Sequence, residues 1–238
     1  RQLKPRCLQD IGDANALYRP GPMGEIPHYI ARRFKKEEVD YPHEDLKEIL
    51  EPTYGIMIYQ EQLMQVVQKI AGFSLSKADN LRRAISKKDF DLMASIKNDF
   101  IEGALKNGYS QKQVNEIFAL IEKFADYGFN KSHAIAYGLI AYQLAYLKAN
   151  HPLAFYGAIL SNEQNSDVHK MEYIAEAKKY RIRVLPPSIN YSTNRFEQVE
   201  GDLRFSLLGI KNVGQAGYQA IVEEREKNGL FKDIFDFI

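Results

Sequence analysis

The chain has a single cysteine, no long apolar run and no excess of charge of either sign. Cys7 excludes an internal disulfide framework and fits a reducing compartment, so we expect a cytoplasmic protein. No run of about eighteen apolar residues occurs, so the sequence predicts no membrane-spanning helix. The 32 Lys and Arg residues are matched by 31 Asp and Glu residues. Any argument for binding to nucleic acid therefore rests on local clusters of cations.

The residue patterns of metal sites and of phosphoryl-transfer catalysis are missing as well. The five histidines are scattered, without Cys or His partners at metal-ligand spacing, so we expect no structural zinc site. Phosphoryl transfer on DNA usually requires carboxylates that cluster around two Mg²⁺ ions, whereas here Asp and Glu are dispersed over predicted helix surfaces. A glycine-rich P-loop is also absent from the sequence. We therefore expect neither catalytic residues nor metal ligands in this chain.

Three capping boxes in succession predict an array of helices. In a capping box a hydroxyl at the N-cap and an acid or amide three residues later satisfy each other's backbone N–H groups. The pattern occurs at Ser76–Asp79, Ser86–Asp89 and Ser110–Gln113. We therefore expect three helices that begin at these serines, with a break between the first two helices after Ile85.

Other patterns extend the helical array and then end it. Apolar residues at i, i+1, i+4 and i+7 predict a helix that begins near Gln60 and is closed by Gly72. Further helices are expected over residues 134–148 and 168–180. Beyond Arg181, two short strands are expected on either side of a Glu-Gly-Asp turn.

These patterns predict a mostly α protein with a change of character near residue 180. We expect a multi-helix domain over residues 1–180. A small α+β segment that contains a helix-hairpin-helix follows over residues 181–238.

Four cations stand within seven positions of the first two capped helices: Arg82, Arg83, Lys87 and Lys88. On a helix, the first three would lie within an arc of about 140°. If Ser86 begins a new helix, the two lysines stand in its first turn. Cations there interact unfavourably with the helix dipole, at a cost of a few tenths of a kcal/mol each, and a bound anion would make their position favourable. The pattern therefore favours phosphate binding, while a solvated charged helix face remains the alternative.

A polar cluster, Asn130–His133, stands where another helix is predicted to begin. Asn130, Ser132 and His133 are suited to contact a sugar or a base edge, and Lys131 is suited to a phosphate. In the alternative, Ser132 caps the helix and His133 makes a local hydrogen bond. Four tyrosines are likewise candidates either for base stacking or for the core: Tyr54, Tyr59, Tyr127 and Tyr137.

Near the C-terminus, two glycines frame a turn that precedes a predicted helix over residues 215–227. This arrangement is typical of a helix-hairpin-helix, whose backbone amides hold a DNA phosphate without reading the base sequence. We predict DNA binding by Gly209, Lys211 and Gly214, with a positive φ at Gly214. Such hairpins also serve purely structural roles, and this alternative stays open.

Several motifs, in this order, resemble the fingers region of the bacterial replicative DNA polymerase III alpha subunit, a C-family polymerase. Residues after about 180 are similar to the helix-hairpin-helix region that follows the fingers in that family. The motifs are Leu17-Tyr18-Arg19-Pro20-Gly21-Pro22-Met23, Thr53-Tyr54-Gly55, Tyr59-Gln60-Glu61-Gln62, Ala78-Asp79, Arg82-Arg83-Ala84, Lys87-Lys88 and Phe129-Asn130-Lys131-Ser132-His133-Ala134.

The resemblance implies that the fingers close over an incoming deoxynucleoside triphosphate (dNTP). The catalytic aspartates and the Mg²⁺ that they hold belong to a palm outside this chain. The implied partners are the dNTP, primer–template DNA, the rest of the alpha subunit and a sliding clamp. By matching positions, the triphosphate is bound by Arg82, Arg83, Lys87 and Lys88, and the nascent base pair is lined by Asn130, Lys131, Ser132 and His133.

Two other functions remain open, namely a non-catalytic helical DNA-binding module led by the hairpin and a protein-interaction scaffold. Better binding of triphosphates than of duplex DNA favours the fingers module, and binding of neither ligand favours the scaffold. We expect the chain to be a piece of a longer protein that incorporates no nucleotide by itself.

Overall fold

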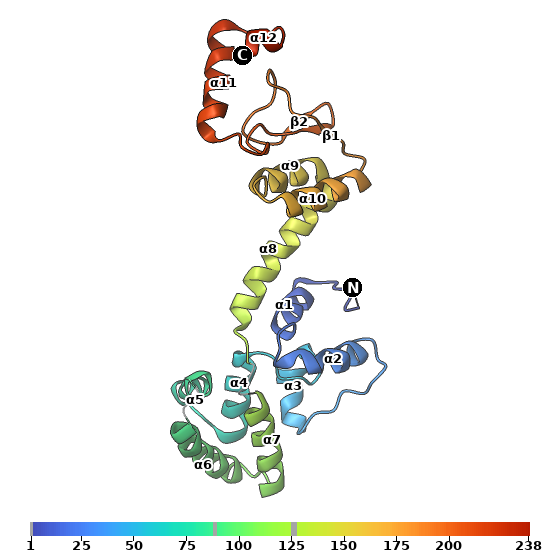
Figure 1. The fold of residues 1–238 in the computed structure, drawn as a ribbon. Coiled ribbons are helices and arrows are strands. Elements are labelled where there is room, and N and C mark those ends of the chain that lie inside the picture. The colour runs from blue at the N-terminus through green and yellow to red at the C-terminus, as the bar shows by residue number, and fades with distance from the viewer. Residues whose placement is uncertain (1, 88–89, 125–127) are drawn as a thin grey trace. The chain divides into compact units, whose positions relative to one another are not determined.

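The computed structural model describes residues 2–87, 90–124 and 128–238, which form a mostly helical fold with a small sheet (Figure 1). This confirms the predicted fold class. Contacts divide the chain into two compact units, residues 1–142 and residues 143–238. The predicted domain boundary near residue 180 stays a prediction. Lys88 and Tyr127, two residues of the sequence hypotheses, lie outside the described residues.

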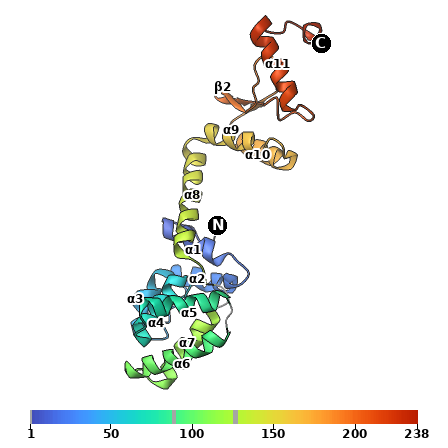
Figure 2. The same ribbon diagram turned by 90° about the vertical axis from the view of Figure 1, so that its left-hand side faces the viewer.

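In the first unit, helices cover most of the chain, and α8 begins there and continues into the second unit (Figures 1 and 2). Short 3-10 helices at Pro22–Glu25, Glu44–Leu46 and Glu51–Thr53 lie between the first α-helices. The helices are α1 Leu8–Leu17, α2 Ile26–Arg33, α3 Lys47–Leu50, α4 Gln60–Ala71, α5 Leu75–Lys87, α6 Phe90–Lys106, α7 Gln111–Phe124 and α8 Lys131–Asn150.

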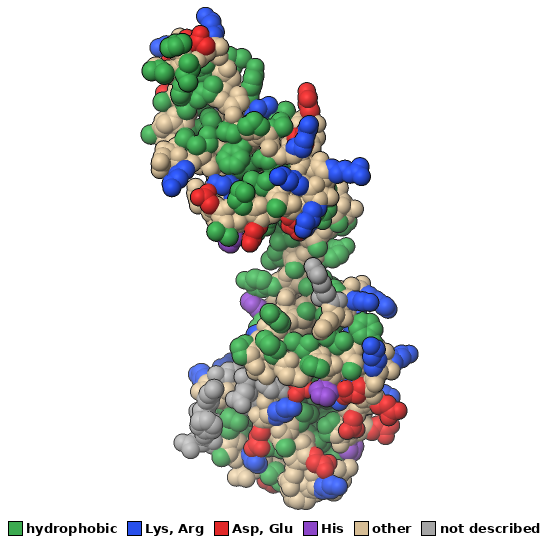
Figure 3. Space-filling model, turned by 45° about the vertical axis from the view of Figure 1, so that its right-hand side comes forward, with side chains coloured by type: hydrophobic (Ala, Val, Ile, Leu, Met, Phe, Trp, Pro, Cys, Tyr) green, Lys and Arg blue, Asp and Glu red, His purple; other side chains and the backbone are tan. Residues whose placement is uncertain are grey.

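The surface of the molecule carries charges of both signs. Figure 3 shows Lys and Arg side chains among Asp and Glu side chains on one face, in agreement with the net charge of +1. Among the described residues, no helix has the length and apolar character needed to cross a membrane.

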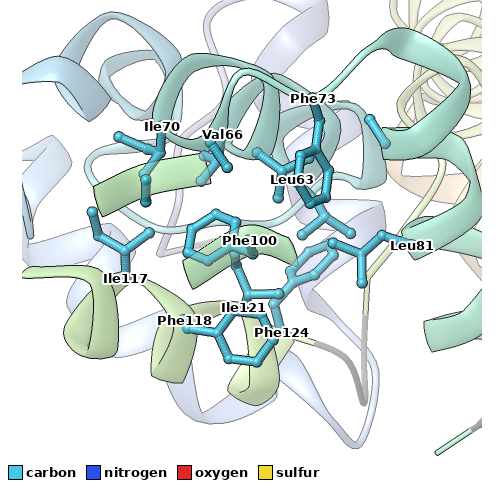
Figure 4. Close-up of a cluster of buried hydrophobic side chains, with 14 of the residues drawn as sticks. Leu63, Val66, Ile70, Phe73, Leu81, Phe100, Ile117, Phe118, Ile121 and Phe124 are labelled. Carbon is cyan, nitrogen blue, oxygen red and sulfur yellow. The ribbon is translucent and has the colours of Figure 1, made fainter. Parts of the chain in front are cut away.

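The apolar core of the first unit lies among α4, α5, α6 and α7. The α4 residues at i, i+3 and i+7, Leu63, Val66 and Ile70, are all 0% exposed and point toward Phe100 of α6 (Figure 4). Gly103 of α6 allows close packing on α4, because a Cβ there would come within 2.3 Å of the Ala71 carbonyl oxygen. Burial of these side chains, each worth about 1.5–3 kcal/mol, orders the helical array.

The end of α4 and the beginning of α7 follow the sequence predictions. Gly72 caps α4 with φ 68°, a conformation that glycine adopts without strain. The capping box before α7 is also confirmed: the Ser110 N–H donates to Gln113 Oε1 at 2.8 Å, and the Gln113 N–H donates to Ser110 Oγ at 3.4 Å.

The two other predicted helix starts are wrong. α5 begins at Leu75, and Ser74 rather than Ser76 accepts the N–H of Lys77 at 3.2 Å. α5 then continues through Ser86 to Lys87, and α6 begins only at Phe90. The reason is packing, because Ala78, Leu81, Ala84 and Ile85 of α5 are all buried in the apolar core and hold one continuous helix.

The correction at Ser86 removes one argument for phosphate binding. Lys87 lies in the last turn of α5, where a cation is favourable to the helix dipole. It is therefore not a misplaced charge that needs an anion. The single helix does keep Arg82, Arg83 and Lys87 on the expected arc of about 140°.

The N-terminal region contains two helices, α1 and α2, that the sequence patterns did not predict. The buried face of α1 includes two carboxylates, Asp10 and Asp13, at 5% and 0% exposure, so the apolar period of a helix is absent from it. Residues 56–59, an apolar run that could form a short buried strand, are buried but form extended chain rather than a strand of the sheet. Tyr59 forms an isolated parallel bridge with Phe129.

The second unit combines helices with a small sheet of order β1-β3-β2. β1 pairs parallel with β3, and β2 pairs antiparallel with β3, which confirms the predicted hairpin. Glu200 and Gly201 form its turn with φ 51° and 88°. α9 and α10 pack side by side (Figures 1 and 2). The elements are α9 Pro152–Asn162, α10 Asp167–Lys179, β1 Val184–Leu185, β2 Glu197–Val199, β3 Asp202–Arg204, α11 Gln215–Asn228 and α12 Ile234–Phe237.

Candidate functional site

The first turn of α4 connects the two predicted nucleotide-binding motifs. On one side, Gln60 Oε1 accepts a long hydrogen bond of 3.5 Å from Arg82 Nη1 of α5. On the other side, the Glu61 carboxylate accepts from Asn130 Nδ2 at 3.2 Å and from the Lys131 N–H at 3.0 Å. Residues that are far apart in the sequence are thereby brought together at one end of α4.

The backbone before α4 fixes the second motif in place. The Phe129 N–H donates to the Ile58 carbonyl at 3.1 Å, and the Gln60 N–H donates to the Phe129 carbonyl at 2.9 Å. Gln60 Nε2 also donates to the Gly128 carbonyl at 3.4 Å. Because these bonds hold residues 128 and 129, Asn130 necessarily follows beside the start of α4.

Asn130, not Ser132, is the N-cap of α8. Asn130 Oδ1 accepts the N–H of His133 at 2.8 Å, and the helix begins at Lys131, three residues before the predicted start. The Asn130 carbonyl accepts the N–H of Ala134 at 3.1 Å. With the Lys131 N–H bound to Glu61, three amides of this terminus, those of Lys131, His133 and Ala134, have protein partners.

The side chains of the α8 motif are accessible. Asn130, Ser132 and His133 are exposed, and Lys131 is half-buried. The Lys131 ammonium lies 5.7 Å from the centroid of the Tyr59 ring, a cation–π distance. The predicted group is therefore presented together on the first turn of one helix.

The cations of α5 share one carboxylate. Asp79 accepts from Arg82 Nε at 2.7 Å and from Arg83 Nε at 2.8 Å. The hydrogen bond from Arg82 is the main reason why the pKa of Asp79 is lowered. Arg82 is 29% exposed and Arg83 is 64% exposed, and Lys87 is exposed in the last turn. In the described part of α5, one carboxylate thus contacts two of these three cations, and Lys88 lies outside the described residues.

The structure shows which of the described tyrosines considered for base stacking are buried and which are exposed. Tyr59 is 0% exposed and belongs to a core cluster. Tyr54 is half-buried and meets Tyr29 edge-on at 5.0 Å. Tyr137 is 57% exposed, and its ring lies 4.6 Å from that of His133. Tyr137 is thus the described tyrosine that is both accessible and beside the α8 motif.

Sequence reasoning did not assign Gln60, Glu61 or Arg19 to the site. The Arg19 guanidinium lies 4.3 Å from the centroid of the Phe129 ring. Burial lowers the pKa of Arg19. The signal in the sequence was membership in the motifs Leu17–Met23 and Tyr59–Gln62, since none of the three residues stands in a charge cluster.

A cavity of about 670 Å³ adjoins the α8 motif on the Glu61 side of α4. Its size is typical of small-molecule sites. Lys131 is the predicted residue that lines it, and the helix face between Glu61 and Lys69 contributes three glutamines. Within the part of the chain that the structure describes, no group of His, Cys, Asp and Glu is placed to hold a metal ion.

The predicted DNA-binding residues lie in one segment of the second unit. Residues 207–212 form turns and bends, and no helix is described between β3 and α11. Gly209 is buried, and a Cβ there would come within 2.8 Å of the Phe205 ring. The Gly209 carbonyl accepts a hydrogen bond from Lys170 Nζ at 3.0 Å. Lys211 is exposed.

The predicted positive φ at Gly214 is wrong. Gly214 is the N-cap of α11 with φ −91°, which any residue adopts, and a Cβ there would meet nothing within 4 Å. Asn212 has the positive φ of 70° in this turn. Asn tolerates this conformation better than most residues, so the turn closes without glycine.

Comparisons with known proteins agree with the predicted order, in which a fingers region is followed by a helix-hairpin-helix region. Residues 1–108 match the family model described as the bacterial DNA polymerase III alpha subunit finger domain. Residues 181–238 match the model described as a helix-hairpin-helix motif.

Relatives match over the whole length of the chain. DNA polymerase III subunit alpha of Borreliella burgdorferi is 50% identical over 238 residues, which are 21% of that protein. The subunit of Bacillus subtilis is 48% identical over 237 residues, again 21% of its length, and that of Thermus aquaticus is 46% identical over 243 residues, 20% of its length. The chain therefore spans about a fifth of the curated relatives that it matches. Its residues 1–108 belong to the finger-domain family of the bacterial DNA polymerase III alpha subunit, and a helix-hairpin-helix motif follows over residues 181–238.

Proposed function

We propose that this chain is the fingers module of a DNA-directed DNA polymerase, in which the first unit binds the triphosphate of the incoming dNTP. The observation that carries the proposal is the junction at α4, where Gln60 contacts Arg82 and Glu61 contacts Asn130 and Lys131. Two polar motifs with the chemistry of nucleotide binding thus share one support. The catalytic aspartates, and the Mg²⁺ that they hold, belong to the remainder of the polymerase.

In this proposal the α5 cations bind phosphate oxygens. Arg82 and Arg83 present planar guanidinium groups, which bind phosphate with two parallel hydrogen bonds. Asp79 holds both groups in orientation through their Nε atoms, and Arg82 Nη1 also donates to Gln60 Oε1. Lys87, and Lys88 beyond the described residues, add charge that stabilises the leaving phosphates.

The α8 motif then lines the nascent base pair. Asn130, Ser132 and His133 present hydrogen-bonding side chains from one helix turn, and Lys131 stands beside them. We further propose that the fingers extend over residues 1–180 and the helix-hairpin-helix region over residues 181–238. The partners are primer–template DNA, the rest of the alpha subunit and a sliding clamp.

Removal of the α5 charges tests the proposal. In an alpha subunit that contains this chain, Arg82→Ala or Arg83→Ala should lower kcat/KM for dNTP about ten- to a hundredfold, because a charge-assisted contact is worth roughly 1.5–3 kcal/mol. Lys112→Ala, at an exposed position of α7, is the control. Wild-type kinetics in both folded arginine variants would overturn the assignment.

A test of the chain alone addresses where catalysis resides. With Mg²⁺ and a primed template, the purified chain should incorporate no nucleotide, because the catalytic carboxylates belong to the remainder of the polymerase. Robust primer extension, free of contaminating polymerase, would show that catalysis resides here.

The match to a helix-hairpin-helix model favours a second role, sequence-independent contact with the DNA backbone by the segment around Gly209 and Lys211. With one or two phosphates neutralised, duplex binding should be weak, with a slope of about −1 to −2 for log K against log salt. Gly214→Val fits the backbone and the empty space at this position. It should therefore fold and yet block a phosphate at the start of α11. Equal duplex affinity of the variant and the wild type would make the hairpin structural.

A further inference from the structure

A buried carboxylate lies behind the candidate nucleotide site of the first unit. Asp13 of α1 is 0% exposed. It accepts hydrogen bonds from the Tyr29 and Tyr59 hydroxyls, both at 2.5 Å, and from Gln9 Nε2 at 2.6 Å. We call these four residues the Asp13 cluster.

Burial of the Asp13 carboxylate costs free energy that a purely structural core would not require. Burial raises the pKa of Asp13, while the hydrogen bonds from the two phenols and from Gln9 lower it. Burial also raises the pKa of both phenols, so they remain donors. Apolar residues of similar volume often stabilise a core as well as a buried charge or better. What the carboxylate adds is direction, because each phenol is held at one hydrogen-bonding position.

Tyr59 extends from the Asp13 cluster to the site. Its side chain ends at Asp13, whereas its backbone is the N-cap of α4 and forms the parallel bridge to Phe129. The Lys131 ammonium also lies over its ring at 5.7 Å. One residue therefore connects the buried carboxylate to the segment that contains Asn130.

The helix that contains Asp13 also packs directly on the beginning of α8. A Cβ at Gly12 would come within 2.7 Å of Ile135 Cδ1, and Asn15 Nδ2 donates to the Ala134 carbonyl at 3.5 Å. Figures 1 and 2 both show α1 beside the first turns of α8. A shift of α1 or of Tyr59 would therefore move the α8 motif.

We infer that Asp13 is a positioning residue for the nucleotide site, which acts through Tyr59 to fix residues 129–131 against the first turn of α4. The inference rests on the proposed function and assigns to it a residue that does not touch the ligand. Tyr29 binds the same carboxylate from α2 and meets Tyr54 edge-on, but its backbone, unlike that of Tyr59, does not form the bridge to Phe129.

The two phenols provide a matched pair of variants. Tyr59→Phe and Tyr29→Phe each remove the hydrogen bond of 2.5 Å to Asp13 and keep the buried ring, and Tyr59→Phe also removes the acceptor of a long hydrogen bond of 3.4 Å from Gln9 Nε2. Both should lower the stability of the polymerase to a similar extent. In steady-state primer extension, Tyr59→Phe should raise the KM for dNTP about fivefold, in the range expected for one lost hydrogen bond, and Tyr29→Phe should raise it less than about twofold.

Equal KM values for Tyr59→Phe and Tyr29→Phe would overturn the inference. If Tyr59→Phe does not fold, Gln9→Met replaces it, because Gln9 Nε2 donates to the same oxygen of Asp13 as the Tyr59 hydroxyl. A KM no higher than that of Tyr29→Phe would then overturn the inference. Arg82→Ala is measured alongside. If it leaves dNTP kinetics unchanged, the proposed function fails, whereas a normal Arg82 effect with equal tyrosine variants rejects the positioning role alone.

Discussion

The apolar core among α4–α7 and the Asp13 cluster stabilise neighbouring parts of the first unit by different means. Phe100, with 0% exposure, meets Phe73 and Phe118 at ring distances of 6.2 and 5.3 Å in the apolar core. Asp13, equally buried, is held by three hydrogen bonds. Apolar packing gains free energy in proportion to area and has little directionality, whereas the hydrogen bonds fix positions.

The difference explains where the candidate site lies. Both motifs of the site attach to the first turn of α4, which belongs to the apolar core through Leu63 and to the Asp13 cluster through Tyr59. The apolar core supplies stability, and the polar contacts set the position of Asn130 and Lys131. Variants that weaken one without the other test this division.

The largest effect is expected in the apolar core. Phe100→Ala leaves a cavity between α4 and α7 and should lower the free energy of unfolding by about 3–5 kcal/mol. Leu105→Ala, on the same helix at 42% exposure, should change it by about 0.5 kcal/mol or less. Urea unfolding of the chain measures both values, and equal losses would contradict the assignment of Phe100 to a close-packed core.

The next effect depends on pH and comes from Asp10. A hydrogen bond from the Arg33 side chain is the main cause that lowers the pKa of Asp10 to about 2. The Asp10 side chain is 8% exposed and the Arg33 side chain is 7% exposed. A lowered folded-state pKa stabilises the fold above the ordinary pKa of 3.8, and this stabilisation is lost as the pH falls through the folded value.

Asp10→Asn measures this contribution. The gap in unfolding free energy between the wild type and Asp10→Asn should be about 2 kcal/mol smaller at pH 2 than at pH 5. Urea unfolding at the two pH values provides the comparison, with Asp99→Asn, 46% exposed on α6, as the control. A gap that does not change with pH would mean that the ion pair with Arg33 does not lower the pKa of Asp10.

A smaller effect is expected at the cap of α8. Asn130→Ala removes the acceptor of the His133 N–H and should cost about 1 kcal/mol of unfolding free energy. Ser132→Ala, at an exposed position in the same turn, should stay within about 0.5 kcal/mol of the wild type. If the serine variant is the more destabilised of the two, Ser132 rather than Asn130 is the cap in solution.

The smallest effect is expected from Asp13, whose pKa is shifted in the direction opposite to that of Asp10 on the same helix. Burial raises the pKa of Asp13, so its contribution to stability is fully present below the ordinary pKa and is lost as the pH rises through the folded value. The gap between the wild type and Asp13→Asn should therefore grow as the pH is lowered, opposite to the gap for Asp10→Asn. The same pH series measures it, and a parallel trend for both variants would contradict the environment assigned to Asp13.

Local signals in the sequence predicted the elements whose boundaries depend on nearby residues. Ser110–Gln113 and Gly72 were correct because a cap is satisfied within one turn of its own helix. Ser86 failed although it has the same pattern, since the buried face of α5 continues past Ile85 and one helix buries it better than two.

By itself, the sequence determined the mostly helical class, the order of the motifs and the residue types suited to phosphate and base. These follow from composition, apolar period and short-range hydrogen bonding, which need no knowledge of distant contacts. Only the tertiary structure brought Gln60 to Arg82 and Glu61 to Lys131, and only it placed Asp13 against Tyr59. Each of these pairs joins residues at least 22 positions apart, and a polar side chain has no apolar period to reveal that it is buried. The physical reason is that long-range polar contacts depend on where packed helices deliver their ends, which local patterns do not specify.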